Sequence, residues 1–213
     1  MNDALESYRK AQRHLARRDA VLKSLIGQIG GCTLNPDPDG FNALVRAIIS
    51  QQISTKAARA IHERLRKALK RKLLTPGLIL RASDEVLRTA GLSANKARAL
   101  RDLAEKVKSK AVPLHDCHDM NDEEVIERLV AVRGIGRWTA EMFLIFSLGR
   151  LDVLPVDDFG LRAAAQRNYQ LTELPKKAAP TELAEPWRPF RSIGTWYMWR
   201  SAGFVPRSGD GED

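Results

Sequence analysis

The sequence has few cysteines and no long apolar run, and each shortage excludes a class of protein. Its two cysteines, Cys32 and Cys117, are far apart and lack metal-ligand spacing, so we expect neither a disulfide framework nor a thiolate metal site. No apolar run approaches the ~20 residues that span a membrane, and residues 1–20 are charged throughout, unlike a signal peptide. We therefore expect a cytoplasmic protein that does not associate with a membrane.

A short segment, 115–119, contains the residue types that bind metals. It reads His-Asp-Cys-His-Asp, but it lies beside Pro113 and no second cluster of ligand residues matches it. We interpret it as a solvated loop.

The composition is that of a basic globular protein. With 213 residues, 44% of them hydrophobic and 29% charged, the chain can bury one large core or two small ones. Lys and Arg number 35 against 26 Asp and Glu, which gives a net charge of +9. This excess favours a polyanionic partner but does not distinguish DNA, RNA and anionic lipid.

Apolar residues recur at spacings of three and four along most of the chain, which predicts helices. One stripe runs from Phe41 to Ile49 and predicts a helix that ends near residues 51–52. Ser54 is the expected N-cap of the next helix, whose exposed face is basic. Asn121 and Glu124 have the offset of a capping box. Further helices are predicted at 3–28, 83–90, 95–111, 121–132, 137–149, 158–168 and 185–202.

The remaining segments give no sign of strands. No segment alternates apolar and polar residues over the length of a strand, so the predicted fold class is all-α. Residues 35–40 and the Pro-rich region 174–186 are the expected breaks, and 208–213 is an expected disordered tail.

Residues 129–140 contain two predicted helices joined by a Gly-Ile-Gly turn. We expect Gly134 and Gly136 to turn the backbone with positive φ while Ile135 fills the space between the helices. The N–H groups that open the second helix would form an anion site suited to a DNA phosphate, flanked by Arg133 and Arg137. An ordinary helix connection gives the same string, so this turn alone does not decide the function.

A pair of acids follows the hairpin at the start of another predicted helix. Asp157 and Asp158 come after an apolar connection, where one acid can cap the helix and the other can point away. Standing alone, the pair reads as a doubled N-cap.

Together, the hairpin and the acidic pair resemble the helix-hairpin-helix DNA glycosylase superfamily, in particular its 3-methyladenine DNA glycosylase II-like branch. Asp158 lies 20 residues after Trp138, which is the separation of the catalytic aspartate in that branch. Alignment on the Pro-Val-Asp string of other branches would select Asp157 instead. We therefore predict Asp158 as the catalytic acid and keep Asp157 as the alternative.

The resemblance extends over about residues 42–204 and implies further roles. Gln52 matches the residue that wedges into the gap left by a flipped base. The implied base pocket consists of Trp138, Phe159 and Trp199, whereas we interpret Trp187 and Trp196 as core residues. The implied DNA contacts of the hairpin are Arg133, Gly134, Ile135, Gly136 and Arg137. The backbone carbonyls of Val130, Val132 and Ile135 are implied ligands of a structural monovalent cation, and no organic cofactor is implied.

The resemblance predicts an enzyme that flips alkylated purines, such as 3-methyladenine and 7-methylguanine, out of double-stranded DNA and hydrolyses their N-glycosidic bonds. Trp138 stands where bifunctional relatives have a nucleophilic lysine, so we expect a monofunctional enzyme. Two cysteines cannot build the four-cysteine iron–sulfur site of other relatives.

We expect a central helical lobe at 38–156, a second lobe from 1–37 and 157–207, and the active site in the cleft between them. The expected protein is a monomer, associated with the nucleoid if the cell is bacterial. Two alternatives remain open: a noncatalytic helix-hairpin-helix DNA-binding module, or a glycosylase for hypoxanthine, ethenoadenine, uracil or oxidised guanine.

Overall fold

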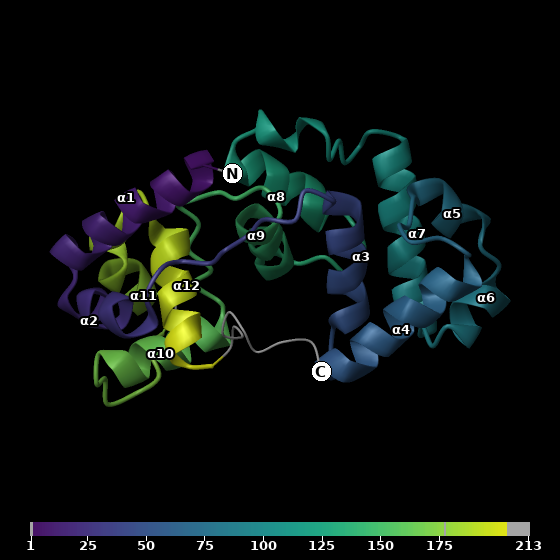
Figure 1. The fold of residues 1–213 in the computed structure, drawn as a ribbon. Coiled ribbons are helices and arrows are strands. Elements are labelled where there is room, and N and C mark those ends of the chain that lie inside the picture. The colour runs from purple at the N-terminus through teal and green to yellow at the C-terminus, as the bar shows by residue number, and fades with distance from the viewer. Residues whose placement is uncertain (1, 177, 204–213) are drawn as a thin grey trace. The chain divides into compact units, whose positions relative to one another are not determined.

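The structure is a computed structural model that describes residues 2–176 and 178–203 (Figure 1). Within these residues it contains helices and connecting loops but no strand, which confirms the predicted all-α class. The expected disordered tail, 208–213, lies outside the described residues.

The chain divides into two compact units. A terminal unit combines Met1–Asn35 with Gly149–Asp213, and a central unit consists of Pro36–Leu148. The terminal unit therefore depends on segments from both ends of the chain, whereas the central unit is continuous.

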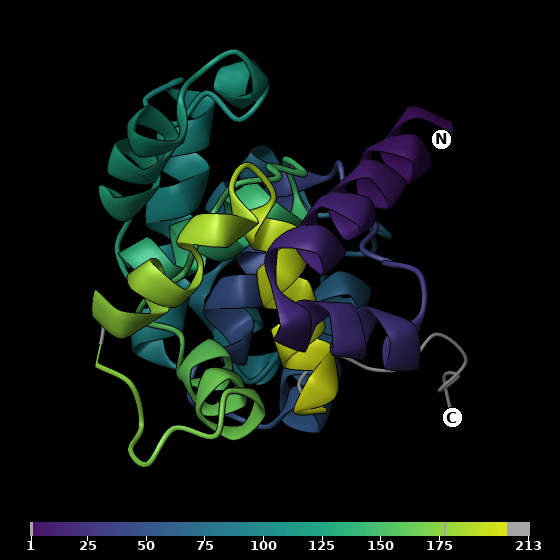
Figure 2. The same cartoon turned by 90° about the vertical axis from the view of Figure 1, so that its left-hand side faces the viewer.

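The terminal unit is organised around one buried helix. Its elements are α1 (Asn2–Arg18), α2 (Ala20–Ile29), α10 (Phe159–Asn168), α11 (Ala178–Leu183), the 3-10 helix η2 (Glu185–Trp187) and α12 (Arg191–Ser201). Helix α12 packs against α1, α2 and α10, and both views show α12 beside α1 and α2 (Figure 2). Trp187 and Trp196 are fully buried, as predicted for core residues.

The predicted single helix at 3–28 is wrong, because the chain breaks at Asp19. This residue is extended, and its carboxylate accepts the N–H of Leu22 at 2.9 Å as the N-cap of α2. The same carboxylate accepts hydrogen bonds from the Tyr169 hydroxyl and, at 2.8 Å, from Trp187 Nε1. These partners are distant in sequence, so apolar periodicity gave no sign of the break.

The central unit contains the hairpin and the helices that pack around α3. Its elements are α3 (Gly40–Ser50), α4 (Thr55–Ala68), α5 (Pro76–Arg81), α6 (Asp84–Thr89), α7 (Ala94–Lys108), the 3-10 helix η1 (Asp116–His118), α8 (Asp122–Val130) and α9 (Arg137–Phe146). Helix α3 packs against α4, α7 and α9, while α5 packs on α7 and α8 on α9. The buried apolar face of α3 therefore forms the centre of this core.

Two predicted caps are confirmed. Ser54 caps α4 by accepting the N–H of Ala57, and Asn121 and Glu124 form both bonds of a capping box at α8.

Short helices were missed by the sequence analysis. Helix α5 begins at the pair Thr75-Pro76, an N-cap followed by proline in the first turn, but its six residues are too short for a periodic pattern. Helix α11 lies inside the expected break at 174–186. The predicted helix at 185–202 is instead η2 and α12, and Pro189 lies in the connection between them.

The segment 115–119 is more ordered than the predicted solvated loop. It contains η1, and its Cys117 is buried. Among the described residues, no group of His, Cys, Asp and Glu side chains is arranged to hold a metal ion.

In the described part of the chain, no helix combines the length and the apolar character needed to cross a bilayer.

Candidate functional site

Asp158 is held in place by the start of one helix and the side chain of another. It is the N-cap of α10, where Oδ1 accepts the N–H of Leu161 at 2.6 Å. The same oxygen accepts the indole N–H of Trp199 on α12 at 2.7 Å. Its own N–H donates to Pro155 O at 3.0 Å. These bonds fix the orientation of a half-buried carboxylate.

The structure brings together two of the predicted site residues, Asp158 and Trp199. Only 5% of Trp199 is exposed, so most of the ring belongs to the core while its N–H contacts the carboxylate. The sequence predicts Trp199 in a base pocket but gives no sign of this hydrogen bond. No spacing pattern could have revealed it, because the two residues are 41 positions apart.

The two residues that flank Asp158 in the sequence are exposed. Asp157 is exposed beside it, and Phe159, the first residue of α10, is 64% exposed. Leaving a phenyl ring in water gives up the stabilisation that burial would provide. Phe159 therefore presents an aromatic surface next to the carboxylate, available to a stacking partner.

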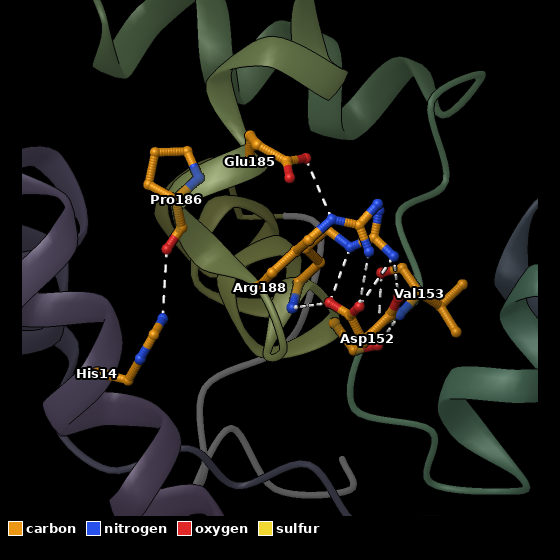
Figure 3. Close-up of polar contacts among 8 residues, drawn as sticks. His14, Asp152, Val153, Glu185, Pro186 and Arg188 are labelled. Atoms are coloured by element: carbon orange, nitrogen blue, oxygen red, sulfur yellow. Dashed lines mark hydrogen bonds and ion pairs between the residues drawn. The ribbon is translucent and has the colours of Figure 1, made fainter.

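Asp152 fastens the connection that leads to Asp158. Its carboxylate accepts Arg191 Nε at 2.8 Å, Arg191 Nη2 at 3.0 Å and Arg188 Nη1 at 3.1 Å. Figure 3 shows Arg188 between Asp152 and Glu185. On the other side of this segment, Pro186 O pairs with His14 Nε2 at 3.3 Å.

A second contact links the same two segments. Ser192 Oγ accepts the N–H of Val153 at 2.9 Å, and the Ser192 N–H donates to Leu151 O at 3.0 Å. The first turn of α12 is thereby fixed to residues 151–153, which precede Asp158. The sequence gives no sign of these contacts, because Asp152 and the two arginines are 36 and 39 positions apart along the chain.

In the hairpin of the central unit, the two glycines have different conformations. Gly134 has φ +78, as predicted, but Gly136 has φ −97 and ψ 173, so the predicted positive φ of Gly136 is wrong. The reason is that Gly136 is the N-cap of α9, a position that takes extended backbone. It has no side chain to bond the first-turn N–H groups, and a Cβ there would meet nothing within 4 Å. The N-cap residue of α9 therefore supplies no side-chain hydrogen bond to the first-turn N–H groups.

The two hairpin arginines differ in how they are paired. The Arg133 backbone N–H donates to Asp102 Oδ2 at 2.6 Å, and its side chain is exposed. The Arg137 guanidinium bonds Glu123, with Nη1 to Oε2 at 3.0 Å, and Glu141 at 3.2 Å. The hydrogen bond to Glu123 raises the pKa of Arg137. Its charge is therefore largely balanced by neighbouring carboxylates.

Gln52 lies in the loop between α3 and α4 and has φ +58, a left-handed conformation that is unfavourable for a residue with a side chain. Its neighbour Gln51 donates from Nε2 to Gly134 O at 2.7 Å. Lys96 Nζ donates to Ile49 O at 2.6 Å, and burial lowers the pKa of this lysine. The loop that carries Gln52 is thus fastened directly to the hairpin turn.

The remaining predicted residues of the central unit lie around the same turn. Trp138, in the first turn of α9, is 46% exposed. Val130 ends α8 and is exposed, while Val132 and Ile135 are buried. The Val132 carbonyl accepts the Ile135 N–H at 3.1 Å, and a carbonyl oxygen keeps a second lone pair for a cation.

Comparison with known families decides the identity. Residues 45–189 match the HhH-GPD superfamily of base excision DNA repair proteins, a range that contains Gln52, the hairpin and Asp158. The chain belongs to this superfamily. The resemblance drawn from the hairpin and the acidic pair is therefore confirmed.

Individual members of the superfamily match along nearly their whole length. The chain is 35% identical to DNA-3-methyladenine glycosylase 1 of Schizosaccharomyces pombe, covering 94% of this chain and 90% of that protein. It is 33% identical to the alkylbase DNA glycosidase-like protein mag2 of the same yeast, covering 91% and 93%. A solved structure of the S. pombe 3-methyladenine DNA glycosylase Mag1 with abasic DNA matches with a TM-score of 0.78 at 35% identity, covering 91% and 97%. The 3-methyladenine glycosylase branch of the superfamily is confirmed.

Proposed function

We propose that this protein is a DNA glycosylase that flips alkylated purines out of duplex DNA and hydrolyses their N-glycosidic bonds. The observation that carries the proposal is the Asp158 carboxylate, which is oriented by the Trp199 indole N–H and the α10 N-terminus. The lesion class rests on the similarity to proteins named DNA-3-methyladenine glycosylases.

The chemistry follows from the carboxylate. As the bond between the base and C1′ breaks, its electron pair leaves with the base and the sugar gains oxocarbenium character. A negative charge beside C1′ stabilises that cation. The carboxylate also accepts a proton from the water that forms the new C1′–O bond. An alkylated purine is already cationic, so it leaves as a neutral base.

The base must first leave the stack, which costs a few kcal/mol. The roles proposed here are that Gln52 fills the gap and that the N–H groups after Gly136 bind a phosphate. Both residues lie in segments joined by the Gln51–Gly134 hydrogen bond. The exposed rings of Trp138 and Phe159 suit stacking against a cationic base, with a contribution of ~0.5–2 kcal/mol each.

The test compares Asp158→Asn with Asp157→Asn on duplexes that contain 7-methylguanine or 3-methyladenine. Asn is a good N-cap and keeps an oxygen for the Trp199 N–H, so Asp158→Asn removes charge but little structure. We expect it to abolish base release while binding of lesion DNA stays within about tenfold. Asp157→Asn should remain active. Near-normal release by Asp158→Asn would transfer the role to Asp157, and activity of both variants would support a noncatalytic module.

The same assay on a panel of single-lesion duplexes tests the lesion class. We expect release of alkylated purines to exceed release of hypoxanthine, ethenoadenine, uracil and oxidised guanine. The reverse order would reassign the substrate without changing the catalytic residue, because pocket shape chooses the base.

The proposed enzyme is monofunctional. A lyase needs an amine that attacks C1′ and forms a Schiff base, and the indole nitrogen of Trp138 cannot replace that amine, because its lone pair belongs to the ring. Incubation of lesion DNA with the enzyme and sodium borohydride should therefore give no covalent adduct and no nick before alkaline treatment. An efficient adduct at the lesion would refute this part of the proposal.

A structural monovalent cation at the hairpin is also proposed, held by the carbonyls of Val130, Val132 and Ile135. All three are neutral oxygen ligands, and α8 ends at Val130 with the negative end of its dipole. At constant ionic strength, K⁺ or Na⁺ should raise the unfolding temperature relative to tetramethylammonium, which is too large to be coordinated. The proposed protein acts as a monomer, which sedimentation with and without lesion DNA would test.

A further inference from the structure

Outside the proposed site, the described part of the central unit carries a concentrated group of positive charges. A shallow groove at the C-terminal end of α4 is lined by Glu63, Arg66, Lys67, Lys70, Arg71 and Lys72. We call this surface the basic groove. It contains five cations and one acid.

The backbone explains why these side chains gather on one side. Glu63, Arg66 and Lys67 are spaced by three and four along α4, so they share one face. The helix then closes with Lys70 at φ +51, and the Arg71 N–H donates to Arg66 O at 3.1 Å. This closure is the one that usually places glycine at the position of Lys70. A lysine here adds a charge at a position where glycine would be less strained.

The positive charges of the groove are not balanced. Among the described residues, none of the five cations forms an ion pair, and Glu63 pairs weakly with Arg59 at 3.6 Å. The α4 dipole favours cations in the last turn, which accounts for Arg66 and Lys67, but this effect falls off beyond the helix end. It therefore gives no reason for the charges at 70–72.

Arg66 shows the same excess beneath the surface. Its Nε is buried and has no hydrogen-bond partner among the described residues. The pKa of His62, one turn earlier, is lowered by burial and then by the positive charges of Arg46 and Arg66. A phosphate-bearing partner would supply the negative charge that this part of the chain lacks.

We propose that the basic groove binds the phosphate backbone of the duplex outside the lesion, as a second DNA contact. This inference rests on the proposed function, since the chain's substrate is then a long polyanion held at the hairpin. Helix α4 has 14 residues, which places its end about 20 Å from the Gln52 loop. At about 3.4 Å per base pair, 20 Å corresponds to about six base pairs of flanking DNA.

The test measures binding to duplexes with a central abasic analogue, either about 31 or about 11 base pairs long, as a function of salt. The variant Lys67→Gln, Lys70→Gln, Lys72→Gln removes three charges from the groove. The matched control is Lys10→Gln, Lys23→Gln, Lys108→Gln, which removes three exposed lysines from α1, α2 and α7. Each phosphate contact contributes about 0.9 to the slope of log K against log salt.

On the long duplex, the slope of the groove variant should be smaller than that of the wild type by up to about 2.7, which is three contacts at about 0.9 each. Raising the salt from about 50 to about 200 mM should therefore weaken binding by the wild type up to about 40-fold more than binding by the groove variant. On the short duplex, the groove variant and wild type should have equal slopes. The control should have the wild-type slope on both duplexes. A groove slope equal to the control on the long duplex, or an equal loss on both duplexes, would overturn the proposal.

Lys70→Gly separates this result from a folding defect. It removes one charge and also relieves the positive φ, so the unfolding temperature should not fall. The long-duplex slope should still drop by about 0.9. An unchanged slope in this variant and the triple variant would assign the groove to another partner, such as an acidic protein. Failure of the proposed function would appear separately, as absence of base release by the wild-type protein.

Discussion

The hydrogen bond between Trp199 and Asp158 gives a prediction that separates catalysis from packing. Trp199→Phe removes the indole N–H that lies 2.7 Å from Asp158 Oδ1, while a ring still fills most of the site. A hydrogen bond to a charged group contributes about 1.5–3 kcal/mol. If it orients the carboxylate toward the sugar in the transition state, its loss should lower kcat about 10- to 150-fold. KM should change little, because this group does not grip the DNA.

Trp196→Phe is the matched control. Trp196 is on the same helix, is 1% exposed and packs edge-on against Tyr197, and among the described residues the indole N–H bonded to Asp158 belongs to Trp199 instead. Both variants should unfold at lower temperature, since each removes buried surface. Single-turnover release of 7-methylguanine at saturating enzyme would measure the chemical step. Equal losses in the two variants, or an active Trp199→Phe, would refute a positioning role for the indole.

Three other changes test the DNA-binding segments. Gly136→Leu should weaken binding to damaged and undamaged duplexes alike in a titration. It should lower the free energy of unfolding by only about 0.5–1 kcal/mol, because Leu is a poorer N-cap than Gly although its Cβ meets nothing within 4 Å. Gln52→Gly should raise the free energy of unfolding by up to ~1 kcal/mol by relieving positive φ, yet lower base release. Asp102→Asn should lower the free energy of unfolding by ~1–2 kcal/mol. This is less than a fully buried charged hydrogen bond would contribute, because the Asp102 side chain is 26% exposed and solvent screens its charge. Burial raises the Asp102 pKa, but the hydrogen bonds from Lys106 and the Arg133 N–H outweigh burial and lower the pKa below 3.8. The stabilisation by Asp102 is therefore complete above pH 3.8 and disappears as the pH falls through the lowered pKa. Acid unfolding of both proteins should show the difference in their free energies of unfolding shrinking as the pH falls. Lower affinity confined to lesion DNA, an unstable Gln52→Gly, or a constant difference for Asp102→Asn would contradict the respective prediction.

The sequence predicted the features that depend on neighbouring residues. Helices with clear periodicity, the caps at Ser54 and Asn121, and the superfamily all followed from local patterns. The placement of Asp158 at a helix start also follows from its position before an apolar helix.

The features it missed depend on residues that are distant along the chain. The break at Asp19 is stabilised by Tyr169 and Trp187, about 150 and 168 positions away. The Trp199 bond to Asp158 likewise has no signature in either segment. For Gly136, the pattern identified the turn, but which glycine takes positive φ depends on where α9 begins.

The discontinuity of the terminal unit has a consequence for how the protein is made. The central unit, Pro36–Leu148, is one uninterrupted stretch, so it can fold as soon as that stretch has left the ribosome. Helices α1 and α2 are synthesised earlier, but Tyr169, Trp187 and Tyr197, which bond Asp19 and Gly30 at the two ends of α2, follow the central unit in the chain. These helices must therefore wait, with apolar faces uncovered, until that later segment has been synthesised. The part of the protein that carries Asp158 is the last to form, and a chaperone that shields nascent apolar segments would act on α1 and α2.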